Sequence, residues 1–201
     1  GYNIAPDAGA PIAGAALADQ VLALPGANQT RPSPPALLPT QIVWDGTGTP
    51  ANFQIDYDFF FGDTYNSGAG NFAWFDDGTA ADGALPANNC IIAGTRSLSG
   101  ADQYFRIQVG AVTGGTEART PKVGGNNDDL SKSLTHHINL KFFPGSHLIV
   151  MKATCAGNVK GDFYTAYTGD YKNILKNTKA RGWSTIQAGS MKVTNIKFLK
   201  L

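Results

Sequence analysis

The segment that decides the fold class runs from Asn52 to Phe61 and reads NFQIDYDFFF. Its large apolar residues occupy every second position, at Phe53, Ile55, Tyr57, Phe59 and Phe61. Polar residues fill the positions between them, at Gln54, Asp56 and Asp58. A period of two over this length predicts a β-strand with one apolar and one polar face. We expect the apolar face to lie in a core and the polar face to be solvated, with partial cover near Phe60.

Further short apolar runs, separated by Gly, Pro, Asn and Asp, extend this pattern along the chain. They predict strands at residues 41–44, 72–75, 89–93, 103–110, 137–143, 147–153, 163–167 and 191–199. The turn Pro144-Gly145-Ser146 predicts a hairpin with a three-residue loop. Residues 110–131 predict a long polar loop. Asp170 is expected to cap a short helix that reaches about Lys179.

The order of these elements predicts an all-β fold. About eight to ten short strands, one late helix and no alternation of strand and helix are typical of an antiparallel β-sandwich, jelly-roll-like in architecture. No internal repeat or linker interrupts residues 40–201, which we predict to form a single β-sandwich domain. With 201 residues, the chain is long enough to bury about 70% of the surface of its unfolded state.

Residues 1–39 differ from the rest of the chain in being rich in Ala, Gly and Pro. A short helix is predicted between Pro11 and Pro25, too short to be stable alone in water. Its apolar residues are Ile12, Leu17, Val21 and Leu24. We interpret the segment as an extended N-terminal arm that contacts a neighbouring subunit through these four residues. A loose tail, or a strand-like wrap around its own domain, is the alternative.

Charge is sorted along the sequence. Residues 1–116 carry ten Asp and three Arg, a formal charge of −7, whereas residues 117–201 carry thirteen basic and five acidic residues, a formal charge of +8. Such a chain can attract copies of itself or offer its basic part to a polyanion. Charged residues make up only 15% of the chain, against about 25% in typical domains. This low fraction favours a surface covered by neighbours, with a stable Ser/Thr/Asn-rich surface as the alternative.

The basic C-terminal part holds the best candidates for contact with a polyanion or an acidic partner, namely Lys172, Lys176, Lys179 and Arg181. The three lysines follow a spacing that shares one helix face. Aromatic residues are interleaved with them, at Tyr164, Tyr167, Tyr171 and Trp183. Basic and aromatic residues together can bind nucleic acid or an anionic membrane surface. A solvated basic face is the alternative, since no nucleic-acid-binding motif is present.

The acidic turns offer the only candidate metal ligands besides the histidines. Asp76, Asp77 and Asp82 form the best group for Ca²⁺, which prefers several loop oxygens. Their spacing matches no known calcium loop, and Asp-Gly is also common turn chemistry. The adjacent His136 and His137 point to opposite faces of a strand, so at most one can share a site with His147. We therefore expect no cofactor other than a calcium ion at the acidic turns.

No motif for catalysis stands out. The chain has no phosphate-binding loop and no nucleophile elbow. Asp56 and Asp58 lie about 7 Å apart along one strand face, a separation that a glycosidase could use, but a solvated strand face accounts for both. We therefore predict no catalytic residues, no enzyme activity and no small-molecule substrate.

Two cysteines are present, Cys90 and Cys155. Both adjoin apolar runs, which predicts small buried side chains. A single disulfide between them is the alternative, because two cysteines alone do not decide the question. No apolar run is long enough to span a membrane as a helix.

Three features together resemble the single-jelly-roll capsid, penton and spike proteins of virus particles: the Pro/Ala-rich arm, the β-domain that is poor in charge, and the sorted charges. The resemblance covers roughly residues 40–201 and rests on architecture. It implies a structural protein of the virion that self-assembles, with copies of itself and other particle proteins as partners. The arm would tie neighbours together, and complementary charge would set their register.

Two further functions fit the same sequence. One is a secreted or cell-surface β-sandwich module that binds carbohydrate. Its candidate sugar platform consists of Trp44, Trp74, Trp183 and the tyrosines. The other is a filament or surface-layer subunit, which would form open head-to-tail contacts.

Overall fold

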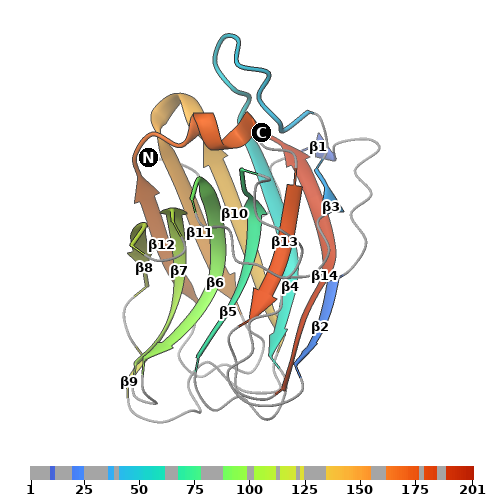
Figure 1. The fold of residues 1–201 in the computed structure, drawn as a ribbon, viewed down its shortest axis with the longest axis vertical. Helices are drawn as coiled ribbons and strands as arrows, with labels where there is room; N and C mark the ends of the chain where they lie inside the picture. The colour runs from blue at the N-terminus through green and yellow to red at the C-terminus, as the bar shows by residue number, and fades with distance from the viewer. Residues whose placement is uncertain are drawn as a thin grey trace.

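The computed structural model contains two antiparallel sheets that lie face to face (Figure 1). It describes residues 10–11, 20–24, 36–38, 41–61, 68–77, 88–98, 102–111, 114–120, 123–124, 135–154, 162–176, 179–184 and 189–201. The predicted all-β sandwich is confirmed.

The first sheet has seven strands in the described part of the chain. Along its main path the order is β1-β14-β4-β10-β11-β12, and β2 also pairs with β14. The bounds are β1 Ala10–Pro11, β2 Gln20–Leu24, β4 Phe53–Phe61, β10 Thr135–Phe143, β11 Leu148–Thr154, β12 Phe163–Thr168 and β14 Gly189–Lys200. The strand predicted from the alternating segment is therefore present as β4, at the centre of this sheet. Its neighbours β10 and β14 lie far later in the sequence, so long-range pairing builds the sheet.

The second sheet also has seven described strands. Its main order is β3-β13-β5-β6-β7-β8, and β9 pairs with β7. The bounds are β3 Ala36–Leu37, β5 Gly68–Phe75, β6 Cys90–Leu98, β7 Asp102–Gly110, β8 Thr116–Arg119, β9 Val123–Gly124 and β13 Lys179–Ser184. In Figure 1 this sheet lies in front of the first. The residues 110–131 that were predicted to be a loop thus contain β8 and β9, which pair with β7.

The core fills the space between the sheets and is built from inward residues of the central strands, among them β4, β7, β10 and β11. Phe53 of β4 stacks on Phe142 of β10 with ring centroids 4.4 Å apart, and it meets Phe75 of the other sheet at 6.0 Å. Phe105 of β7 likewise meets Phe163 of β12 at 5.3 Å. Apolar area removed from water contributes about 25 cal/mol per Å². Aromatic contacts between the layers therefore hold the sandwich closed.

The polar face of β4 is not solvated as the sequence predicted. Gln54 and Asp56 are both buried. The Asp56 carboxylate accepts hydrogen bonds from Gln54 Nε2, at 2.9 Å, and from Asn139 Nδ2 of β10, at 2.6 Å. Asn139 and Lys141 of β10, which pair with Asp56 and Gln54, are buried as well. A buried carboxylate needs such donors, and the side chains of Gln54 and Asn139 hold Asp56 within the sheet.

The C-terminal helix is shorter than predicted. A 3₁₀ turn, η2, covers Lys172–Lys176, and Lys179 already begins β13. The reason is sheet pairing: β13 hydrogen-bonds to β5, which a continued helix would prevent. A second 3₁₀ turn, η1, covers Pro144–Ser146 between β10 and β11, as expected for the predicted hairpin. No helix in the described ranges is long and apolar enough to cross a membrane.

The described parts of residues 1–39 pair with strands of the same chain. β1 and β2 pair with β14, and β3 pairs with β13. Residues 20–24 therefore form a strand where a helix was predicted, which matches the alternative of a wrap around the chain's own sheets. Val21 and Leu24 lie in this strand, whereas Ile12 and Leu17 lie outside the described residues. Contact of these four residues with a neighbouring subunit stays a prediction.

The sorted charges of the sequence are interleaved in the fold. β4 belongs to the acidic part of the chain, yet it lies between β14 and β10 of the basic part. The register places Lys197 of β14 opposite Asp56 of β4. In the other sheet, β13 of the basic part pairs with β5 of the acidic part. Antiparallel pairing of distant segments thus mixes the two charges within each sheet.

Candidate functional site

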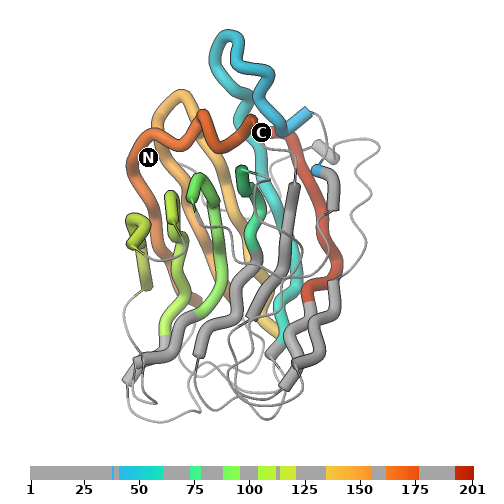
Figure 2. Tube along the Cα trace, in the orientation of Figure 1, coloured from blue at the N-terminus to red at the C-terminus, as the bar shows by residue number. Residues whose placement is uncertain are grey.

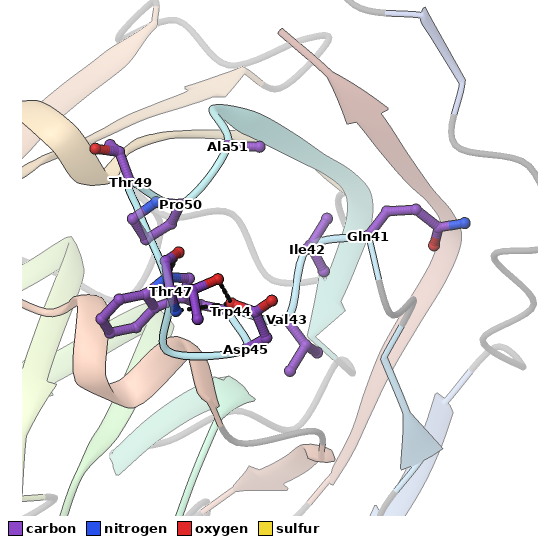
Figure 3. A pocket seen from close by; sticks show the side chains of 9 residues that line it. All are labelled: Gln41, Ile42, Val43, Trp44, Asp45, Thr47, Thr49, Pro50 and Ala51. Carbon is purple, nitrogen blue, oxygen red and sulfur yellow. Dashed lines mark hydrogen bonds between the residues drawn. The ribbon is translucent and has the colours of Figure 1, made fainter.

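A pocket of about 300 Å³ lies in the loop that leads into β4. It is lined by Gln41, Ile42, Val43, Trp44, Asp45, Thr47, Thr49, Pro50 and Ala51. Figure 3 shows Trp44, Thr47 and Pro50 at one side of the pocket and Gln41 and Ile42 at the other. Ligand pockets span roughly 300–1,000 Å³, so this one suits a single small ring.

Local hydrogen bonds give the loop a defined shape. Asp45 Oδ1 accepts from the backbone N–H of Thr47, at 2.8 Å, and from its hydroxyl, at 2.7 Å. The indole Nε1 of Trp44 donates to the carbonyl of Thr47 at 2.7 Å. Gly46 between them has a φ of +96°, which L side chains rarely adopt. The Asp-Gly turn therefore fixes the half-exposed Trp44 ring in place.

The 3₁₀ turn η2 packs against this loop. Figure 2 shows the loop in blue and the 170–176 segment in orange, together at one end of the sandwich. The backbone N–H of Trp44 donates to the carbonyl of Leu175 at 2.9 Å. Lys176 Nζ lies 4.9 Å and Lys172 Nζ 5.9 Å from the centroid of the Trp44 ring. The site therefore combines one tryptophan with two cations.

The η2 turn is itself anchored to the sandwich. Ile174 and Leu175 are buried in the core. The hydroxyl of the buried Tyr171 donates to the carbonyl of Leu148 at 2.8 Å. Asp170 Oδ1 accepts from the backbone N–H of Lys172 at 3.1 Å. The two lysines are thus presented by a fixed segment rather than by a loose loop.

The Asp45 turn gives a pH-dependent prediction. Hydrogen bonds from the Thr47 backbone and hydroxyl lower the pKa of Asp45 below its usual 3.8. A lowered pKa means that the turn is stabilised above pH 3.8 and loses this contribution as the pH falls through the folded-state value. We expect the Thr47 amide resonance to titrate below pH 3.8 in NMR spectra. Asp45→Asn should abolish that titration, and a Thr47 transition above pH 3.8 would contradict the account.

A second polar cluster lies on the outer face of the second sheet. Arg106 of β7 forms an ion pair with Glu117 of β8 at 2.8 Å, and Tyr104 donates to the same carboxylate at 2.9 Å. Arg119 lies 5.4 Å from the centroid of the Tyr104 ring. Arg106 is almost fully buried. The ion pair and the Tyr104 hydrogen bond therefore hold β7 against β8.

Only two of the three aspartates predicted to bind calcium lie among the described residues. Asp76 is buried, Asp77 is half-buried, and both lie near Cys90, while Asp82 lies outside the described residues. No group of three or more His, Cys, Asp or Glu side chains suited to a metal occurs in the described part of the chain. Calcium binding by the three aspartates stays a prediction.

The histidines do not form a metal pair. His136 is buried in the core against Phe105, with ring centroids 5.2 Å apart. His137 points to the opposite face, where its Nδ1 lies 3.0 Å from Asp58 Oδ1. His147 is exposed at the end of η1 with a φ of 54°. The prediction that His136 and His137 lie on opposite faces is confirmed.

Cys90 is a free, buried thiol, as one of the two sequence readings predicted. Burial, with Asp76 and Asp77 nearby, raises the pKa of this thiol to about 12. Its Sγ also donates to the carbonyl of Gly110 at 2.9 Å. Cys155 lies outside the described residues.

The raised pKa predicts an inert thiol. At pH 8 Cys90 is therefore almost entirely in the thiol form, and the thiolate is the reactive form. We expect native protein treated with iodoacetamide at pH 8 to carry no label on the Cys90 peptide, and urea-unfolded protein to carry it fully. Peptide mapping separates this signal from that of Cys155. Rapid labelling of native Cys90 would show that the site is open.

The structure brings together only some of the residues singled out in the sequence. Lys172 and Lys176 meet at Trp44, whereas Lys179 and Arg181 lie in β13. The helix face that the three lysines were predicted to share therefore does not form. The predicted sugar platform of three tryptophans and the tyrosines does not form one surface either, because Trp74 is fully buried and cannot contact a ligand. The pocket itself was missed, since residues 41–44 were predicted to be a strand. The Asp-Gly-Thr-Gly turn at residues 45–48 was the available signal for a shaped loop.

No family model and no curated protein matches the sequence. The fold, however, is similar to solved lectins. Lectin I from Ulex europaeus, in complex with the methyl glycoside of α-L-fucose, has a TM-score of 0.58 and 13% identity, and the match covers 90% of this chain and 85% of that one. Lectin UEA-II complexed with galactose has a TM-score of 0.60 and 12% identity over 89% of this chain and 86% of that one.

Winged bean acidic lectin, complexed with methyl-α-D-galactose, is similar to the same degree. Its TM-score is 0.58 at 12% identity, and the match covers 90% of this chain and 84% of that one. At such low identity the likeness establishes the fold alone. It supports the β-sandwich, jelly-roll-like architecture that the viral resemblance implied. The viral assignment itself, and with it a virion location, has no support from these comparisons.

Proposed function

We propose that this chain is a non-catalytic β-sandwich module that binds carbohydrate in the Trp44 pocket. The observation that carries the proposal is a half-exposed tryptophan in a shaped pocket, on a fold similar to that of three lectins solved with sugars. This function was the alternative in the sequence analysis, and the comparisons favour it over virion assembly.

The chemistry of the pocket suits a sugar ring. Sugars present apolar C–H faces that pack on an aromatic ring, and hydroxyls that need hydrogen-bond partners. Trp44 supplies the aromatic surface. The exposed side chains of Asp45, Thr47 and Thr49 supply polar groups around it. Polar groups make up most of the surface of the pocket, which suits a ligand with many hydroxyls.

The absence of enzyme activity is part of this proposal. Asp56 is held by Gln54 and Asn139, and Asp58 is held by His137 and Asn195. Neither carboxylate lines the Trp44 pocket. A binding module of this kind would act outside cells or at their surface, where glycans are displayed. Association with copies of itself also stays a proposal, which light scattering of the intact chain at low and high salt would test.

Titration of the intact protein with free sugars tests the proposed function. We would use isothermal calorimetry with galactose, methyl α-L-fucoside and glucose. Exposed single-sugar sites bind weakly, and a Kd near 1 mM corresponds to about −4 kcal/mol. We expect saturable binding of at least one of these sugars with one site per chain. No saturable binding at tens of millimolar sugar by any of the three would count against the proposal.

A further inference from the structure

Two cations lie beside the pocket. The ammonium groups of Lys172 and Lys176 are 5.9 and 4.9 Å from the centroid of the Trp44 ring, and the same side chain lines the pocket. Lys176 is exposed and Lys172 is half-buried. Among the residues that the structure describes, neither ammonium has a carboxylate oxygen within 4.0 Å. Both lysines are therefore available to an anionic group on a ligand.

The fold keeps these cations close to the pocket. Lys172 and Lys176 lie on a turn whose residue Leu175 is buried and accepts a hydrogen bond from the Trp44 backbone. The pocket loop approaches so closely that a Cβ at Gly46 would lie 3.3 Å from Cε of Lys176. The loop and the lysines therefore form one continuous surface around the ring.

The carboxylates of the two segments are held by local hydrogen bonds. Asp45 accepts two hydrogen bonds from Thr47, and Asp170 accepts one from the backbone of Lys172. A lysine ammonium carries three donors. An ammonium that faces an aromatic ring still has N–H groups directed away from the ring. A carboxylate on the ligand can accept these, and such charge-assisted hydrogen bonds are stronger than neutral ones.

From this juxtaposition we infer that the site prefers acidic sugars of the hexuronic acid class. The sugar ring lies in the Trp44 pocket, and its carboxylate meets the ammonium groups of Lys172 and Lys176. The inference rests on the proposed function and names the substrate class for the same site. In this proposal the two lysines contact the carboxylate of a single sugar unit, not the polyanion that the sequence suggested.

Paired titrations of the intact protein test the preference. The probes are galacturonic acid against galactose, and glucuronic acid against glucose, at pH 7. Each pair differs in a carboxylate at the position of the terminal hydroxymethyl group. We expect roughly 3- to 10-fold tighter binding of the acid at low salt, since exposed ion pairs are individually modest. The ratio should fall towards one in about 1 M salt, where the Debye length is about 3 Å.

Matched variants separate the charge from the shape of the site. The double variant Lys172→Met and Lys176→Met keeps most of the side-chain length and removes both charges. It should lose the preference for the acid, so that the acidic and the neutral sugar of each pair bind with similar affinity. The control Lys172→Arg and Lys176→Arg keeps both charges and should retain that preference. Thermal unfolding of both variants would show that the fold is intact.

Each outcome is decisive. Equal binding of acidic and neutral sugars by the unmodified chain would overturn the inference and leave the proposed function standing. A preference for acid that survives in the Met variant would overturn the role of the two lysines. No binding of any sugar would overturn both proposals. If a single-stranded oligonucleotide binds through these lysines while the sugars show no preference, the acidic sugar is the wrong ligand.

Discussion

Replacement of Trp74 with alanine lowers the free energy of unfolding by about 3–5 kcal/mol, the range for a large aromatic residue in a core. Trp74 is fully buried. Its ring centroid lies 4.9 Å from that of Tyr57 in β4 and 6.0 Å from that of Phe198 in β14. Because Trp74 belongs to β5 of the other sheet, the substitution leaves a cavity between the layers. Urea unfolding followed by circular dichroism measures the change.

The control for this experiment is Tyr164→Ala. Tyr164 is also aromatic but is 43% exposed in β12, where its ring lies 5.6 Å from Lys152 Nζ. Tyr164→Ala should lower the free energy of unfolding by less than about 1 kcal/mol, as surface substitutions usually do. If Trp74→Ala were as mild as Tyr164→Ala, the two sheets would not pack through Trp74 as described.

Replacement of Trp44 with alanine is expected to weaken sugar binding at least about 30-fold, equivalent to about 2 kcal/mol, the effect of removing a tryptophan anchor from a binding site. The substitution removes the aromatic wall of the pocket and the ring beside the two lysines. Because Trp44 is only half-buried, the fold should survive. Calorimetric titration with the sugar that the unmodified chain binds best measures the loss.

Two companion variants make this result specific. Trp44→Phe keeps an aromatic ring but loses the indole hydrogen bond to the Thr47 carbonyl, so it should retain part of the affinity. Tyr164→Ala removes an exposed aromatic residue that does not line the pocket, so it should bind sugar as the unmodified chain does. Unchanged binding by Trp44→Ala would place the sugar elsewhere on the molecule.

The strands with a clear apolar pattern in sequence were predictable. β4 and β7 alternate, β11 is largely a continuous apolar run, and these strands and β10 lie within a few residues of their predicted bounds, because their apolar side chains are buried in the core. The missed strands are those without such a pattern. β13 reads KARGWS and β8 reads TEAR, and both form through pairing with a neighbour that lies elsewhere in the sequence.

The candidate site was less predictable than the fold. Residues 41–44 have the composition of a strand, but the Asp-Gly turn that follows bends the chain into a pocket. Lys172 and Lys176 were predicted, together with Lys179 and Arg181, to contact a polyanion or an acidic partner. Their position beside Trp44, which is more than 120 residues earlier in the sequence, depends on how η2 packs. A single sequence contains no local signal for such a contact. The burial of Gln54 and Asp56 was missed for the same reason, since it depends on neighbouring strands.

The most direct test of carbohydrate binding at this pocket is an NMR titration of the ¹⁵N-labelled intact chain with galactose, methyl α-L-fucoside and galacturonic acid. We predict saturable shifts of the Trp44 indole N–H and of the Gly46 and Thr47 amides with at least one of these sugars. The amide resonances around Arg106 and Glu117, on the outer face of the second sheet, should not shift. Shifts confined to that outer face, or no shift with any of the sugars, would contradict the account.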